Sequence, residues 1–183
     1  MPYATNDGTR IHYRVEGSGP PLILQHGFFW SLDGWQKWGY VDALKSHFRL
    51  VLVDARGHGA SDKPHEAAAY SLTHQVADIV AVLDALGISS AHYWGFSMGG
   101  WIGFGVATSA PERISALIIG GAHPYGRTLP KPVHGEGSDP ELFLETFFRR
   151  QGLDGETMGP AKLEEFLKLN GAFQDRAGAL EPV

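Results

Sequence analysis

Gly95-Phe96-Ser97-Met98-Gly99 is the stretch from which the fold of this chain can be read. An apolar run over residues 91–94 precedes it, and residues 98–109, which are rich in small side chains, follow it and stop short of Pro111. This order predicts a strand, a sharp turn at the serine and then a helix.

A serine at such a turn sits on strained backbone. Side chains two residues before and two residues after it would clash, and glycine removes them. The hydroxyl of Ser97 then projects above the sheet edge, and the helix that begins at Met98 points its first N–H groups at the same place, where they favour a developing negative charge. An ordinary glycine-rich turn is the alternative, but the flanking pattern favours Ser97 as a nucleophile.

Three further apolar runs each lead into a loop that contains glycine, as strands buried on both faces of a parallel sheet do. These runs cover residues 22–24, 50–53 and 114–119. A hairpin precedes them, with a turn at Asp7-Gly8 and a strand over residues 9–16. Helical patterns lie at residues 36–46, 72–86 and 98–109. Alternating strands and helices predict a doubly wound α/β domain.

Composition excludes several classes of protein. A formal net charge of -5 over 183 residues gives no attraction to nucleic acid or to an anionic membrane. The chain has no cysteine, so disulfides and thiolate sites are excluded. The first residues carry no signal-peptide pattern and no apolar run approaches the roughly 20 residues of a membrane helix, so we expect a cytoplasmic protein. Histidines at positions 12, 47, 65, 74 and 92 are too scattered to indicate a metal site.

Two backbone N–H groups are expected to form an oxyanion hole beside Ser97. One belongs to Met98, directly after the nucleophile. The other must come from a loop at the same end of the sheet, and Phe28, after His26-Gly27, is the candidate. The side chain of His26 itself is interpreted as a packed, hydrogen-bonded histidine that shapes this loop.

A third motif runs from Asp54 to Pro64 and contains Asp54, Arg56 and His58. These three side chains resemble a catalytic set at first sight. We instead interpret the motif as a structural loop that is held by charge pairing and glycine turns.

In order and spacing, the three motifs resemble the α/β-hydrolase superfamily, in particular the branch of aryl esterases, cofactor-free perhydrolases and 3-oxoadipate enol-lactonases. The resemblance covers residues 8–126. It implies a mostly parallel sheet flanked by helices over residues 1–126, C-terminally incomplete, followed by a helical cap-like segment over residues 127–183. It assigns the nucleophile to Ser97, the oxyanion donors to Phe28 and Met98, and no cofactor.

In this family the triad follows the chain order serine, acid, histidine. The 183 residues are expected to stop before the positions of that acid and histidine. His123, one strand over from Ser97, is a surrogate base or a residue of the pocket wall, and we favour the wall.

The resemblance therefore implies a serine hydrolase that acts on small esters, lactones or thioesters through an acyl-enzyme, weakly or not at all within these residues. Serine at the turn argues against dehalogenase and epoxide hydrolase chemistry, which uses an aspartate nucleophile in this fold. One alternative is a non-catalytic half of the fold that binds a ligand or associates with itself; another is a lyase or cofactor-free oxygenase. Aromatic residues expected at the pocket suit an apolar or aromatic substrate: Phe28, Phe29, Trp30 and Phe96.

The strand over residues 114–119 has no charge, no proline and high β-propensity. If it lies at the edge of the sheet, its unpaired N–H and C=O groups favour association. We expect either self-association there or pairing with a chain that supplies further strands.

Overall fold

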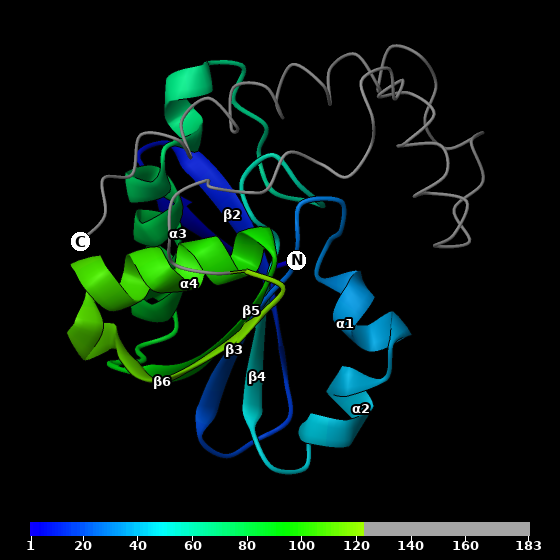
Figure 1. The fold of residues 1–183 in the computed structure, drawn as a ribbon. Coiled ribbons are helices and arrows are strands. Elements are labelled where there is room, and N and C mark those ends of the chain that lie inside the picture. Colours follow the sequence, from blue (N-terminus) through cyan, green and yellow to red (C-terminus); the bar gives the residue numbers. More distant parts are fainter. Residues whose placement is uncertain (123–183) are drawn as a thin grey trace, which may run out of the picture. The chain divides into compact units, whose positions relative to one another are not determined.

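The computed structural model describes residues 1–122 (Figure 1). The predicted boundary at residue 126, the cap-like segment 127–183 and His123 lie outside the described residues. Within residues 1–122, one six-stranded sheet has the strand order β1-β2-β4-β3-β5-β6. Its strands are β1 Tyr3–Asn6, β2 Thr9–Glu16, β3 Pro21–Gln25, β4 Arg49–Val53, β5 Ala91–Phe96 and β6 Ile114–Gly120.

The sheet is parallel except at its N-terminal side. β1 pairs with β2, and β2 with β4, in antiparallel fashion, whereas the pairs β3–β4, β3–β5 and β5–β6 are parallel. The predicted hairpin is present, with Asp7 at φ 46° and Gly8 at φ 77°. Two positive φ values in a two-residue turn match the twist of paired strands. The predicted α/β-hydrolase-type sheet is therefore confirmed.

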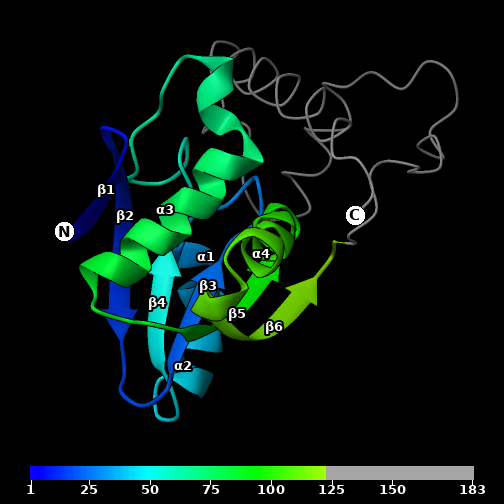
Figure 2. The same ribbon diagram turned by 90° about the vertical axis from the view of Figure 1, so that its left-hand side faces the viewer.

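Helices cover both faces of the sheet (Figures 1 and 2). α1 and α2 lie on one face, and α3 and α4 lie on the other. The helices are α1 Asp33–Lys37, α2 Tyr40–Leu44, α3 Leu72–Ala85 and α4 Met98–Ser109, with short 3-10 turns at η1 Ala67–Tyr70 and η2 Pro111–Arg113. Among residues 1–122, no helix combines the length and apolar character needed to cross a bilayer.

The helix predicted over residues 36–46 is wrong in detail, because the structure has two short helices there. α1 ends at Lys37 and α2 begins at Tyr40. Gly39 between them has φ 80°, a left-handed conformation that no α-helix can continue through. The prediction over residues 72–86 is confirmed: Ser71 caps α3 by accepting a hydrogen bond from the N–H of His74.

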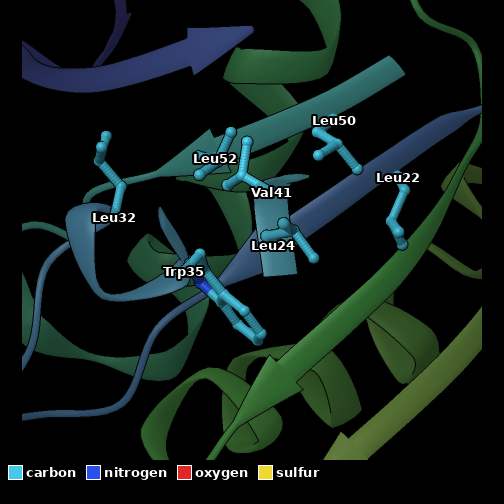
Figure 3. Close-up of a cluster of buried hydrophobic side chains, with 7 residues drawn as sticks. All are labelled: Leu22, Leu24, Leu32, Trp35, Val41, Leu50 and Leu52. Atoms are coloured by element: carbon cyan, nitrogen blue, oxygen red, sulfur yellow. The ribbon is translucent and has the colours of Figure 1, made fainter. Parts of the chain in front are cut away.

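One part of the core lies between the central strands and the two short helices (Figure 3). Alternate residues of β3 and β4 supply leucines to this face, and α1 and α2 supply Trp35 and Val41. The full cluster is Leu22, Leu24, Leu32, Trp35, Val41, Leu50 and Leu52. This cluster therefore fixes β3 and β4, the two strands from which the loops at residues 26–32 and after Val53 begin.

β6 is the last strand of the sheet within residues 1–122. Ile118 on this strand is 49% exposed. The expected position at the edge of the described sheet is thus observed, while association along that edge stays a prediction.

We expect Leu52→Ala to lower the free energy of unfolding by about 2–5 kcal/mol, because it leaves a cavity beneath β4. Leu52 is fully buried in the cluster of Figure 3. Urea unfolding followed by circular dichroism measures the change. Ile118→Ala, at an exposed site, is the matched control and should cost less than about 1 kcal/mol. Equal losses in the two variants would contradict this account of the core.

Candidate active site

The strand order places a point of chain reversal at the carboxyl ends of β3 and β5. β3 lies between β4 and β5. The chain leaves β3 toward β4 on one side and leaves β5 toward β6 on the other. Doubly wound sheets bind ligands at such a point of reversal. The loop that follows β3, residues 26–32, is called the oxyanion loop after the role predicted for it; it meets Ser97, which follows β5, at this point of reversal.

Ser97 joins β5 to α4 through strained backbone. Its φ of 52° and ψ of -114° make it one of two non-glycine residues with positive φ within residues 1–122. Such a conformation costs on the order of 1–3 kcal/mol and persists only when its surroundings impose it. Here the N–H of Ser97 donates to the carbonyl of Gly120 at 2.7 Å, and its carbonyl accepts from the N–H of Gly100 at 2.9 Å.

The two glycines that flank the serine allow a close approach of backbone to backbone. A Cβ on Gly95 would lie 2.2 Å from the carbonyl oxygen of Gly99. A Cβ on Gly99 would lie 2.2 Å from the carbonyl oxygen of Gln25, at the end of β3. Both distances are shorter than any real contact, so the steric reason predicted for the glycines is confirmed.

The oxyanion loop lies directly beside Ser97. A Cβ on Gly27 would lie 3.4 Å from the Cβ of Ser97. Phe28, the next residue, is half-buried, and Met98 is buried at the first turn of α4. The structure therefore brings together the three residues that the sequence predicts, while their roles stay a prediction.

Aromatic rings flank Ser97 on the side of the oxyanion loop. Trp30 stacks on Phe96 with 5.0 Å between ring centroids and 19° between ring planes. The Phe96 ring is partly exposed and packs between Gly27 and Gly120. The sequence analysis did not identify Trp38, whose ring contacts that of Trp30 edge-on, with 4.1 Å between ring centroids. Its signal was weak because it fell inside a predicted helix.

Phe29 lies next to Phe28 in the same loop, with 5.5 Å between ring centroids in an edge-on arrangement. The structure thus places all four predicted aromatic residues on the oxyanion loop or next to Ser97.

His26 is buried and ties the oxyanion loop to the loop after β4. Its Nε2 accepts the N–H of Ala55 at 3.1 Å, so its proton is on Nδ1, which donates to the carbonyl of Gly27 at 2.7 Å. Burial, with a further contribution from nearby His58, lowers the pKa of His26 to about 3. A neutral, fully bonded ring agrees with the interpretation of His26 as a structural residue.

The motif from Asp54 to Pro64 is held by charge pairing, as predicted. Arg56 forms a buried, bidentate ion pair with Asp78 of α3: its Nε and Nη2 donate to the two carboxylate oxygens, both at 2.6 Å. His58 contacts the carbonyl of Arg56 through Nδ1 at 3.1 Å, and burial lowers its pKa. These polar atoms bond to the loop and to α3, so the motif does not form a triad with Ser97.

The carboxylate of Asp54, which is only 2% exposed, accepts three hydrogen bonds. They come from the N–H of Leu32 at 2.8 Å, His12 Nδ1 at 2.8 Å and the N–H of Ala60 at 3.0 Å. Sequence reasoning placed Asp54 in a structural loop but missed its bond to the oxyanion loop.

Across residues 1–122, no histidine ring or carboxylate hydrogen-bonds to the Ser97 hydroxyl, and no three ligands gather as a metal site would need. The rings of His74 and His92 are bonded to Ser71 and Ser115 instead.

Comparison with known proteins gives one consistent family. A family model described as the alpha/beta hydrolase fold matches residues 20–180. A cis-3-alkyl-4-alkyloxetan-2-one decarboxylase of Shewanella oneidensis is 34% identical, over 72% of this chain and 42% of its own length. The bifunctional epoxide hydrolase 2 of Sus scrofa is 38% identical, over 60% of this chain and 20% of its own length.

Among solved structures, the enol-lactonase from Burkholderia xenovorans LB400 matches with a TM-score of 0.59 and 34% identity, over 63% of this chain and 45% of that one. The matched stretch covers less than half the length of the curated relatives, from 20% to 45% for the first of them.

Stability should depend on pH through His26. Its folded pKa of about 3 lies below the ordinary value of 6.5, so the unfolded chain binds the proton first. The contribution of the neutral His26 to the free energy of unfolding is fully present above pH 6.5 and is lost as the pH falls toward 3. The slope for this group approaches about 1.4 kcal/mol per pH unit. Urea unfolding at several pH values should show a shallower slope for His26→Gln.

His47→Gln is the control for that experiment, because His47 is exposed. It should leave the slope of the parent protein in place. An unchanged slope in His26→Gln would mean that His26 is not the group that titrates.

Proposed function

Because the chain belongs to the family of the alpha/beta hydrolase fold, we propose that it is a serine hydrolase that cleaves small carboxylic esters, lactones or thioesters through an acyl-enzyme on Ser97. The observation that carries the proposal is the backbone of Ser97. Its φ of 52° stores strain at the start of α4, at the carboxyl end of the parallel strand β5. Strain of this kind gathers at functional sites, where it presents a side chain to substrate.

The reaction begins when the Ser97 oxygen attacks the carbonyl carbon and its proton passes to a base. The carbonyl oxygen becomes an oxyanion, which the N–H groups of Phe28 and Met98 stabilise. The N-terminus of the twelve-residue α4 adds a favourable dipole at the same point. The oxyanion then collapses, the C–O or C–S bond to the leaving group breaks, and the leaving group takes up the proton. Water then attacks the acyl carbon and gives its proton to the base, the bond from the carbonyl carbon to the Ser97 oxygen breaks, and that oxygen takes the proton back as the acid leaves.

The base and its acid partner are assigned outside residues 1–122, because no histidine ring of this part hydrogen-bonds to the Ser97 hydroxyl. His123 remains a candidate for the base or for the pocket wall. Losing one key member of such a triad costs on the order of 10⁶ in kcat. We therefore propose that turnover by these residues is weak unless a base is supplied.

The nature of the nucleophile separates this chain from some of its relatives. Several relatives are named epoxide hydrolases, whose chemistry in this fold rests on an aspartate at the turn. This chain has Ser97 there. The likeness to a protein named enol-lactonase supports an ester or lactone substrate instead.

A lyase is the second candidate, because one relative is named a decarboxylase. The two candidates differ in what they require of Ser97. A hydrolase of the proposed type forms a covalent acyl-enzyme on its hydroxyl, whereas a reaction that proceeds without the hydroxyl belongs to the second class.

Where a base acts on Ser97, a fluorophosphonate probe should label it, and Ser97→Ala should abolish both the labelling and the hydrolysis of p-nitrophenyl butyrate. Peptide mass spectrometry locates the label. Ser115→Ala, on β6, is the matched control and should retain both. Ester hydrolysis that survives Ser97→Ala, or a label on another serine alone, would reject the acyl-enzyme and favour the lyase class.

Trp30→Ala should reduce kcat/KM for p-nitrophenyl phenylacetate about 3- to 10-fold more than for p-nitrophenyl acetate, as expected for the loss of one aromatic contact. The reason is the stack of Trp30 on Phe96 beside Ser97, which offers a ring face to an aryl group. Trp35→Phe serves as the control, since Trp35 is buried below the loop in the core cluster. Equal losses on both esters would show that Trp30 does not select aryl substrates.

A further inference from the structure

The carboxylate of Asp54 joins three separate parts of the chain. Its Oδ1 accepts the N–H of Leu32, at the end of the oxyanion loop, at 2.8 Å. Its Oδ2 accepts from Nδ1 of His12, on β2, at 2.8 Å and from the N–H of Ala60 at 3.0 Å. With three donors in place and almost no exposure, the carboxylate has one defined orientation.

The residue after Asp54 holds the other end of the same loop. The N–H of Ala55 donates to Nε2 of His26 at 3.1 Å. The oxyanion loop is thus fastened at its first residue, His26, and at its last, Leu32, by two consecutive residues of the chain. Phe28 lies between these two anchors, and a hydrogen bond from the N–H of Trp30 to the carbonyl of Gly27 at 3.1 Å braces the turn.

The anchor is itself immobilised. The N–H of Asp54 donates to the carbonyl of His12 at 3.0 Å, and the carbonyl of Asp54 accepts from the Ser61 hydroxyl at 2.7 Å. The Ser61 oxygen in turn accepts the N–H of His12 at 2.8 Å. Gly59 packs so closely that a Cβ there would lie 2.2 Å from the Asp54 carboxylate. A side chain at position 59 would therefore displace the Asp54 carboxylate.

We propose that Asp54 is a positioning residue for the oxyanion hole: it fixes the oxyanion loop so that the Phe28 N–H is held in place beside Ser97. This inference rests on the proposed function of Ser97. Stabilisation of an oxyanion depends on donors that are already in place, and a loop that moves by a fraction of an ångström loses much of it. Asp54 is not a catalytic residue, because its oxygens are occupied by Leu32, His12 and Ala60.

Asp54→Asn tests the proposal. The amide has one oxygen where the carboxylate had two, so its NH₂ group faces either the N–H of Leu32 or the two donors of His12 and Ala60. We expect the second-order rate constant for fluorophosphonate labelling of Ser97 to fall about 10- to 100-fold, less than the loss of a whole oxyanion donor. Amide hydrogen exchange at Leu32, measured by NMR, should become about 10-fold faster or more as its carboxylate partner is lost.

Asp78→Asn is the matched control. Asp78 is equally buried and pairs with Arg56 of the same loop, but it makes no bond to the oxyanion loop. It should lower the melting temperature while labelling stays within about twofold of the parent protein and exchange at Leu32 is unchanged. A similar fall in labelling in both variants would overturn the proposal, because it would reflect general loosening. Normal labelling or unchanged Leu32 exchange in Asp54→Asn would overturn it as well.

A second pair of variants covers the case in which Asp54→Asn does not fold. His12→Asn keeps a side-chain N–H for the Asp54 carboxylate, and His12→Leu removes it. Labelling should be faster in His12→Asn than in His12→Leu, and equal rates would overturn the proposal. If the parent protein shows no label at Ser97, the proposed function fails instead, and exchange at Leu32 then decides whether Asp54 fixes the loop.

Discussion

The contact between the first turn of α4 and the end of β3 is the constraint on which the rest of the site depends. Gly99 lies so close to the carbonyl of Gln25 that no side chain is possible there. This contact sets the distance between the oxyanion loop and Ser97. It also imposes the positive φ at Ser97, because the chain must reverse direction between β5 and α4 within one residue.

Around this contact, buried charges take the place of regular structure. The loop after β4 contains no helix or strand before η1. Its shape is maintained by the hydrogen bonds of Asp54 on one side and by the Arg56–Asp78 ion pair on the other. Each charge is satisfied by several partners, which is the condition under which a buried ion is tolerated. Asn6 of β1 adds a hydrogen bond to Asp78 at 2.8 Å. The antiparallel side of the sheet is thereby linked, through Asn6, Asp78 and Arg56, to the loop after β4.

The division of roles among the histidines follows from the same packing. His12 and His26 are buried and bonded to groups that determine loop geometry, and burial keeps His26 neutral over the pH range in which most enzymes work. A neutral imidazole with one donor and one acceptor suits a structural bridge between two backbone segments. The aromatic rings of Trp30 and Phe96 stack on one another next to Ser97, and the Phe96 ring is partly exposed.

The sequence by itself determined the local features. The turn at Ser97, the need for Gly95 and Gly99, the hairpin at Asp7-Gly8 and the cap at Ser71 follow from steric and hydrogen-bonding rules that act within a few residues. Only the tertiary structure decided the rest. It set the strand order β4-β3-β5, which creates the point of reversal beside Ser97. It also set three side-chain contacts: the bond from Leu32 to Asp54, the pairing of Arg56 with Asp78, and the stack of Trp30 on Phe96. These contacts join residues that are 22 or more positions apart. They depend on which strands become neighbours, and the hydrophobic periodicity of one segment does not say which other segment it pairs with.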